Sequence, residues 1–180
     1  NIGGKIYMAR DGLFDGVDVM LAWHPSDETR ADMVSTQAMV DVLVEFKGQA
    51  AHAAADPWNG RSALDAVELF THGINQMREH IKPTSRMHYT IPVAGDVPNV
   101  VPEHAKVWLW LRDWKRDEVE GLLARTRKLA EGAATMTETV ATVRVQGGSW
   151  DMLVNETGGR LLHANLLWLG PLAYTEAEQA

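Results

Sequence analysis

The order of two hydrophobic periodicities between residues 36 and 148 constrains the fold most. Four segments alternate apolar and polar residues, as strands do: 39–46, 87–93, 105–112 and 138–145. Two segments repeat apolar residues at helical spacing: 62–81 and 118–136. The resulting order, β-α-β-β-α-β, is that of a split βαβ or ferredoxin-like unit. We therefore predict an α+β, two-layer domain, in which two helices cover one face of a four-stranded antiparallel sheet.

Finer signals support this prediction. Ser62 followed by Asp65 resembles a capping box at the start of the first helix, and Pro83 lies just beyond its end. The face of the sheet that meets the helices should collect the apolar residues of the alternating segments. These include Val42, Val44, Val107 and Leu109.

The two ends of the chain do not continue this pattern. Residues 1–35 contain a strand or loop from Lys5 to Met8 and an apolar strand from Val17 to Trp23. Residues 149–180 contain one helix, 154–169, and a polar tail. Neither end can form a core alone, so we expect the unit at 36–148 to be a domain inserted into another.

Composition excludes several classes of protein. The net charge of −7 argues against nucleic-acid binding, because phosphate contacts need clustered Lys and Arg. No apolar run approaches the roughly 20 residues that span a bilayer, and no signal peptide is visible. There is no cysteine, which suits a cytoplasmic protein. We expect no nucleic-acid partner, no membrane partner and a cytoplasmic location.

A few residues could carry chemistry. His52 lies among four alanines and directly before Asp-Pro-Trp-Asn-Gly, which ends any regular structure. His24 follows the apolar strand, where metal ligands often occur. Asn99 by default is a turn residue, Arg112 a surface cation, and the pair Trp108 and Trp110 buried packing. The sequence has no Gly-rich phosphate loop, no HExxH pair and no GxSxG elbow.

Several motifs together resemble one known family. The matching segments are Gly48 to Ala53, Pro57 to Ala66, Pro98 to Pro102 with the strand ending in Arg112, Gly4 to Asp15, Trp23 to Pro25, and Glu131 to Thr139. They are similar to the lid domain and its flanks in the dinuclear-metal aminoacylase/carboxypeptidase family, and within it to the p-aminobenzoyl-glutamate hydrolase branch. The resemblance covers nearly the whole chain, with the motifs in the family's order.

The resemblance implies a metal-dependent amidohydrolase, or metallopeptidase, that cleaves an amide bond to glutamate or a similar amino acid. A metal-bound water attacks the amide, with a glutamate as general base. His52 matches a lid histidine that crosses a dimer interface and donates to the oxyanion. Asn99 and Arg112 match residues suited to the substrate carboxylate, and His24 matches a metal ligand. The implied cofactor is a divalent metal, Zn or Mn. The implied partner, which binds through the lid, is an identical chain or a related subunit.

Other parts of the family's pattern have no counterpart here. The family's paired glutamates, its first histidine, its bridging acid and its last histidine are missing, and one histidine cannot hold two metal ions. We therefore interpret 1–35 and 149–180 as fragments of an α/β catalytic domain, and 36–148 as the lid. The chain alone should bind no metal stably and should be inactive.

Two alternatives remain open. One is a stand-alone ferredoxin-like binding or regulatory module, since this fold hosts many functions. The other is an RNA-recognition module, which shares the element order and stacks bases on strand aromatics such as Trp108 and Trp110. The acidic charge counts against the second.

Overall fold

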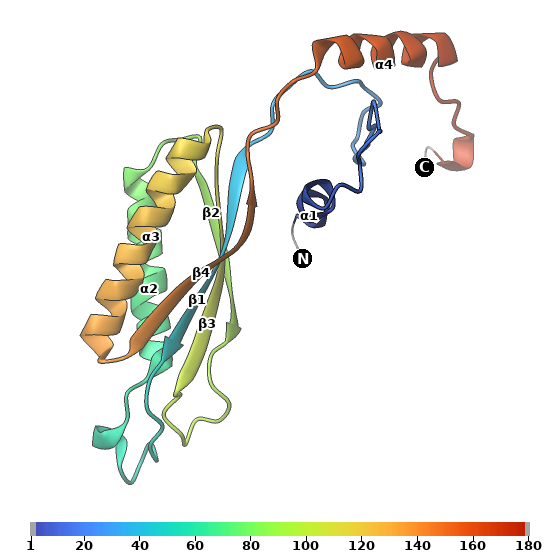
Figure 1. Cartoon of the computed structure of the whole chain (residues 1–180). Coiled ribbons are helices and arrows are strands. Elements are labelled where there is room, and N and C mark those ends of the chain that lie inside the picture. Colours follow the sequence, from blue (N-terminus) through green and yellow to red (C-terminus); the bar gives the residue numbers. More distant parts are fainter. Residues whose placement is uncertain (1–2, 179–180) are drawn as a thin grey trace.

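The computed structural model describes residues 3–178. In this part of the chain, four strands and four α-helices follow one another (Figure 1). In order they are α1 Gly4–Arg10, β1 Ala38–Lys47, α2 Ala63–Met77, β2 Arg86–Val93, β3 His104–Asp113, α3 Arg116–Thr137, β4 Val140–Ser149 and α4 Glu156–Leu169. Short 3-10 helices occupy Pro57–Asn59 (η1), Arg78–His80 (η2) and Glu176–Glu178 (η3).

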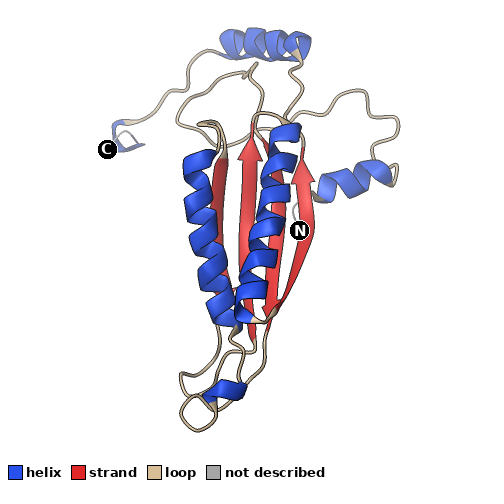
Figure 2. Ribbon diagram, turned by 90° about the vertical axis from the view of Figure 1, so that its left-hand side faces the viewer, coloured by secondary structure: helices blue, strands red, loops and turns tan. Residues whose placement is uncertain are grey.

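The predicted ferredoxin-like fold is confirmed. The strands form one sheet in the order β2-β3-β1-β4, and every neighbouring pair is antiparallel. Helices α2 and α3 lie side by side over one face (Figure 2). Between Asp41 and Val42 the register with β4 shifts, so that Gln146 is the extra residue of a bulge.

The core lies between the sheet and the two helices. Alternate residues of β1 and β3, among them Val42, Val44, Val107 and Leu109, are fully buried there, as the alternation predicts. Phe46 and Phe70 meet with ring centroids 5.8 Å apart and planes at 56°, a favourable tilted geometry. At the start of α2, the Ser62 side chain accepts a hydrogen bond from the Asp65 backbone N–H.

The domain is elongated, and its two ends differ. The chain enters the sheet at Ala38 and leaves it at Ser149, and these residues lie near one end of β1. The loops 48–62 and 94–103 lie at the opposite end, at the bottom of Figure 1. We call these two loops the tip. A strand rises about 3.3 Å per residue, so β1 places the tip roughly 30 Å from the end where the chain enters and leaves.

The flanks correct two predictions. Residues 5–8 belong to helix α1, not to a strand or loop, and the amides of Asp11 and Leu13 close its last turn. Four residues are too few to separate a period of two from one of 3.6. No strand forms at 17–23 either, because no neighbouring strand in the described chain is available to pair with it. The predicted helix near the C-terminus is present as α4.

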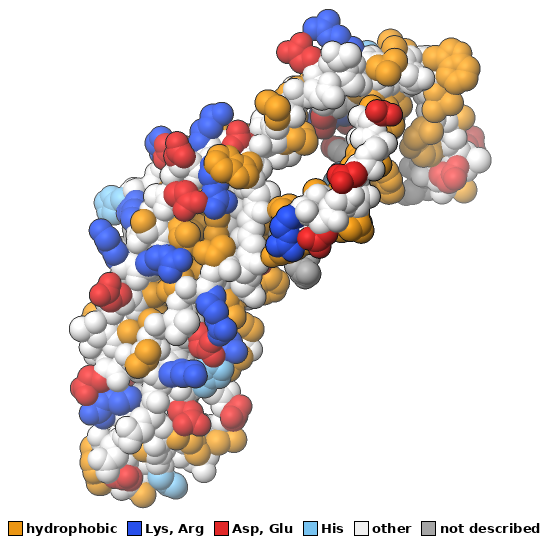
Figure 3. Space-filling model, in the orientation of Figure 1, with side chains coloured by type: hydrophobic (Ala, Val, Ile, Leu, Met, Phe, Trp, Pro, Cys, Tyr) orange, Lys and Arg blue, Asp and Glu red, His pale blue; other side chains and the backbone are white. Residues whose placement is uncertain are grey.

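The flanks bury little of their apolar surface. Trp23, Leu153 and Trp168 are 85%, 94% and 86% exposed, and Figure 3 shows hydrophobic side chains gathered around α4 and the neighbouring segments. None of the helices within residues 3–178 is long and apolar enough to cross a membrane.

Candidate functional site

The loop that carries His52 is pinned at its base. Gln49 and Arg61 exchange two backbone hydrogen bonds, of 2.8 and 2.9 Å, and the Gly48 amide donates to the Glu103 carbonyl at 2.8 Å. A Cβ at Gly48 would lie 1.9 Å from the Arg61 carbonyl oxygen. Glycine is therefore needed where the two backbones approach. The base of the loop is consequently fixed although the loop has little regular structure.

The tip brings His52 and Asn99 together. His52 forms an antiparallel bridge with Val100. The Ala53 amide donates to the Asn99 carbonyl at 2.9 Å, and the Val101 amide donates to the Ala51 carbonyl at 2.9 Å. Two predicted site residues that are 47 positions apart therefore lie on adjacent, paired segments, and both are exposed.

The backbone around His52 selects one tautomer of its ring. Nδ1 accepts the backbone N–H of Ala54 at 3.2 Å and that of Ala55 at 3.1 Å. A nitrogen that accepts carries no proton, so in the neutral ring the proton is on Nε2. The side chain is exposed, and the His52 ring can therefore offer Nε2–H as a hydrogen-bond donor to another molecule.

The His24 ring has the opposite arrangement. A carbonyl oxygen only accepts, so the 2.8 Å contact between Nδ1 and the Pro25 carbonyl places the proton on Nδ1. The lone pair is then on Nε2, the form that a metal ligand needs, with the carbonyl bond orienting the ring. His24 lies in an irregular segment and not at a strand end. Its assignment as a metal ligand stays a prediction.

The described residues do not form a metal site by themselves. Within 3–178, no three His, Asp or Glu side chains are grouped closely enough to hold an ion. A zinc site needs three or four protein ligands. The donors in this part of the chain therefore do not fit the metal implied by the resemblance, and His24 could contribute only one ligand to a site completed elsewhere.

Arg112 lies away from His52 and Asn99. It is near the last residue of β3, whereas Asn99 precedes the first, so the strand separates them by roughly 25 Å. Its guanidinium carbon is 4.9 Å from the centroid of the Trp110 ring. Within one chain the three predicted residues thus form two separate groups, one at the tip and one on the sheet.

The structure also shows a buried charge cluster that the sequence did not indicate. Glu45, on the helix-free face of β1, is 8% exposed. It receives His104 Nε2 at 2.5 Å, Lys106 Nζ at 3.5 Å, and Arg144. The hydrogen bond from His104, with those cations, outweighs burial and lowers the pKa of Glu45. His104 and Arg144 are 40 residues apart, and only the strand register shows that they meet.

Comparison with known proteins decides the family. The peptidase dimerisation domain family matches residues 34–151, which include the whole sheet and both covering helices. The chain belongs to this family. Peptidases that contain this dimerisation domain are generally metal-dependent.

Individual relatives of this peptidase dimerisation domain agree. The chain is 41% identical to one of the p-aminobenzoyl-glutamate hydrolase subunits of Escherichia coli over 98% of its length, which is 37% of the relative. It is 34% identical to human Xaa-Arg dipeptidase over 83% of the chain and 34% of the relative. The chain therefore spans little more than a third of these relatives.

A solved structure has the same fold. The crystal structure of an aminobenzoyl-glutamate utilization protein from Klebsiella pneumoniae superposes with a TM-score of 0.59 at 26% identity. The match covers 70% of this chain and 32% of that one. The family assignment thus rests on sequence and on fold together.

Proposed function

We propose that this chain is the lid and dimerisation part of a longer metal-dependent amidohydrolase. The enzyme cleaves an amide bond to glutamate or a similar amino acid, as in p-aminobenzoyl-glutamate. Residues 1–35 and 149–180 are parts of its α/β catalytic domain, with 36–148 between them. The observation that carries the proposal is the His52 ring, which is exposed at the tip and held as an Nε2–H donor by two backbone amides. The names of relatives support the substrate class.

In this proposal His52 acts in the active site of a second protomer. The donor Nε2–H stabilises the negative oxygen that develops on the amide carbon during cleavage. The tip lies roughly 30 Å from the end of the sheet where the flanks, with His24, are attached. A partner chain in the opposite orientation would bring its own catalytic domain to the tip.

The other two residues bind substrate. Asn99 lies beside His52 through the paired backbone of the tip. Arg112 has a guanidinium fork that matches a carboxylate at two points. The metal, Zn or Mn, is held mainly by residues outside this chain, with His24 as one ligand. A chain without cysteine supports a cytoplasmic location.

The substrate test uses the full-length enzyme loaded with Zn or Mn. We expect release of glutamate from p-aminobenzoyl-glutamate, followed by chromatography. The analogue whose carboxylates are both amides should be cleaved about 10- to 100-fold less efficiently in kcat/KM, because a charge-assisted hydrogen bond is worth roughly that factor. Absence of hydrolysis with either metal would instead favour the stand-alone binding module.

Self-association is the second expectation. The outer strands β2 and β4 each have one neighbour within the described chain, so each leaves an edge with backbone groups available to another strand. We expect a two-fold dimer joined through 36–148. Sedimentation equilibrium of the 180-residue chain should give twice the mass of 19.9 kDa at high concentration. A strictly monomeric mass would contradict the proposed partner.

A further inference from the structure

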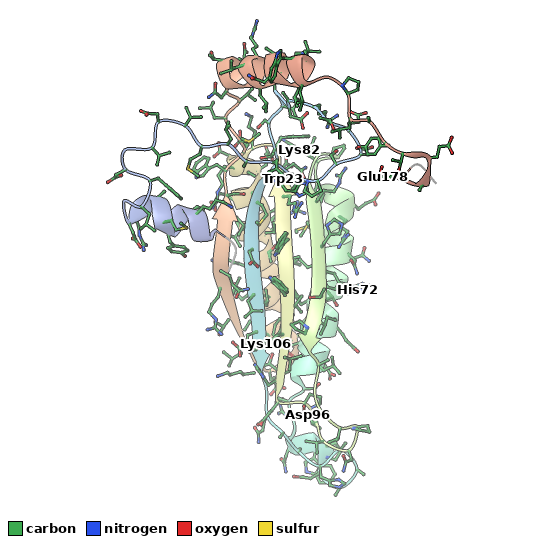
Figure 4. The ribbon with its side chains drawn as sticks, turned by 90° about the vertical axis from the view of Figure 1, so that its right-hand side faces the viewer. Trp23, His72, Lys82, Asp96, Lys106 and Glu178 are labelled. Atoms are coloured by element: carbon green, nitrogen blue, oxygen red, sulfur yellow. The ribbon has the colours of Figure 1, made fainter. Side chains whose placement is uncertain are left out.

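A shallow groove lies on the helix-free face of the sheet, between β2 and β3. Figure 4 views this face, with α2 and α3 behind the strands. The groove has a volume of about 300 Å³, which is at the lower end of the range for small-molecule sites. Its lining residues are His88, Tyr89, Thr90, Trp108, Trp110 and Arg112.

The cation in this groove, Arg112, differs from the others on the same face. Those others are paired, since Lys106 and Arg144 contact Glu45. Among residues 3–178, the contact found for Arg112 is the stacking of its guanidinium on the Trp110 ring, at 4.9 Å. Stacking holds a guanidinium by its face and leaves the N–H groups at its edge free to bind. The groove therefore contains an oriented carboxylate fork.

The Trp110 ring is itself held in place. Trp108 meets it edge to face, with centroids 6.3 Å apart and planes at 78°. The Trp108 indole N–H donates to Asp41 at 2.5 Å, and Asp41 is 3% exposed. These contacts run from Asp41 through both tryptophans to Arg112. Because each step is fixed by the one before it, the position of the guanidinium depends on the Trp110 ring.

The two indole N–H groups of the groove differ in their hydrogen bonding. In the described part of the chain, the buried indole Nε1 of Trp110 is the side-chain atom without a hydrogen-bond partner. An unpaired buried donor costs about 1–3 kcal/mol, so such a group usually indicates a missing acceptor. Trp108, by contrast, uses its N–H and is 41% exposed, which leaves flat apolar surface open to a ligand.

We propose that this groove binds the carboxylate and the flat acyl group of an N-aroyl amino acid. The carboxylate is held by Arg112, and the aromatic acyl group packs on Trp108. In such a molecule the carboxylate and the ring centre are about 6 Å apart, close to the spacing of the two tryptophan rings. Trp110 is a positioning residue that acts through Arg112. The inference rests on the proposed function and deepens it by naming the acyl group.

The test titrates the 180-residue chain with hippurate and follows the indole N–H signals of Trp108 and Trp110 by NMR. Hippurate should shift both signals, with a dissociation constant on the order of 1 mM. Hippuramide, which lacks the charge, should bind roughly ten-fold more weakly. N-acetylglycine, which lacks the ring, should bind roughly five-fold more weakly. Equal binding of hippurate and hippuramide, or unmoved tryptophan signals, would overturn the proposal.

Variants separate the roles of the residues, with binding followed at the backbone amides of β2 and β3. Arg112→Ala should abolish hippurate binding. Arg86→Ala is the matched control, because Arg86 pairs with Arg112 across the strands but contacts the carbonyls of Pro83 and Ser85. It should change the affinity less than two-fold, roughly the scale of exposed charges. Equal losses from the two variants would mean non-specific attraction by charge.

Trp110 tests the positioning. Trp110→Phe keeps a ring beneath the guanidinium and should retain hippurate binding to within roughly five-fold, whereas Trp110→Leu should lose it. If Trp110→Leu bound as well as Trp110→Phe, the ring would have no positioning role. These measurements need no turnover. A failure here with an intact effect of His52 on catalysis would reject the groove alone, and the reverse result would reject the proposed lid function.

Discussion

His52→Ala in the full-length enzyme is expected to lower turnover by about 100- to 1000-fold, the usual cost of removing one oxyanion donor. The Nε2–H donor that its backbone contacts select is lost with the ring. The interaction forms mainly in the transition state, so kcat should fall much more than KM rises. Steady-state kinetics with p-aminobenzoyl-glutamate provide the measurement.

Two controls isolate the effect. Metal content by mass spectrometry should not change, because His52 lies at the tip and His24 in the flank. His72→Ala removes another exposed histidine, on α2, and should leave turnover within about two-fold. If His52→Ala turned over like the parent, His52 would be a structural loop residue.

Mixing variants tests whether His52 acts across the dimer. His52→Ala and His24→Ala should each be inactive alone. In a mixed dimer, the protomer with an intact His24 receives an intact His52 from its partner. After random exchange half of the dimers are mixed, each with one working site, so activity should return to about a quarter of the parent's. No recovery despite proven exchange would place His52 in its own protomer's site.

Phe70→Ala should destabilise the domain by about 3–5 kcal/mol, as large-to-small core substitutions of aromatic residues do. Phe70 is fully buried between α2 and the sheet and packs on Phe46. Removing the ring leaves a cavity at the centre of the layer. Chemical denaturation of the 180-residue chain should show a lower midpoint with an unchanged slope.

The neighbouring residue provides the control. Leu69 is on the same helix but is 37% exposed, so Leu69→Ala should cost less than about 1 kcal/mol. Similar losses for the two variants would mean that Phe70 is not at the centre of the core.

Local periodicity was sufficient to predict the domain from the sequence. Val40 to Phe46 alternate and α2 repeats every three or four residues, so each element indicated which face it buries. The flanks were predicted less well. Helix α1 has seven residues and no buried side chain, so no core-facing pattern identifies it. The Val17 to Trp23 segment is apolar, but a strand also needs a neighbouring strand, which local sequence does not show.

The candidate site was predictable in part. Motif resemblance selected His52, Asn99, Arg112 and His24, but neither spacing nor composition indicated that Arg112 lies at the other end of the sheet from the tip. The role of Trp110 also depends on tertiary contacts, because the sequence favoured buried packing for it. Hydrogen-bond partners, which only the structure shows, distinguish His52 as a donor from His24 as a potential ligand.

The distance between the tip and the flanks makes the domain a lever arm. Strands β1 and β4 are paired along nearly their whole length, so the sheet transmits rotation rather than absorbing it. A hinge of about 10° near residue 38 would displace His52 by about 5 Å over roughly 30 Å. Donor distances in catalysis must hold within about 0.5 Å. Substitutions in the two short connections that join the sheet to the flanks should therefore alter catalysis although they lie far from the reacting amide.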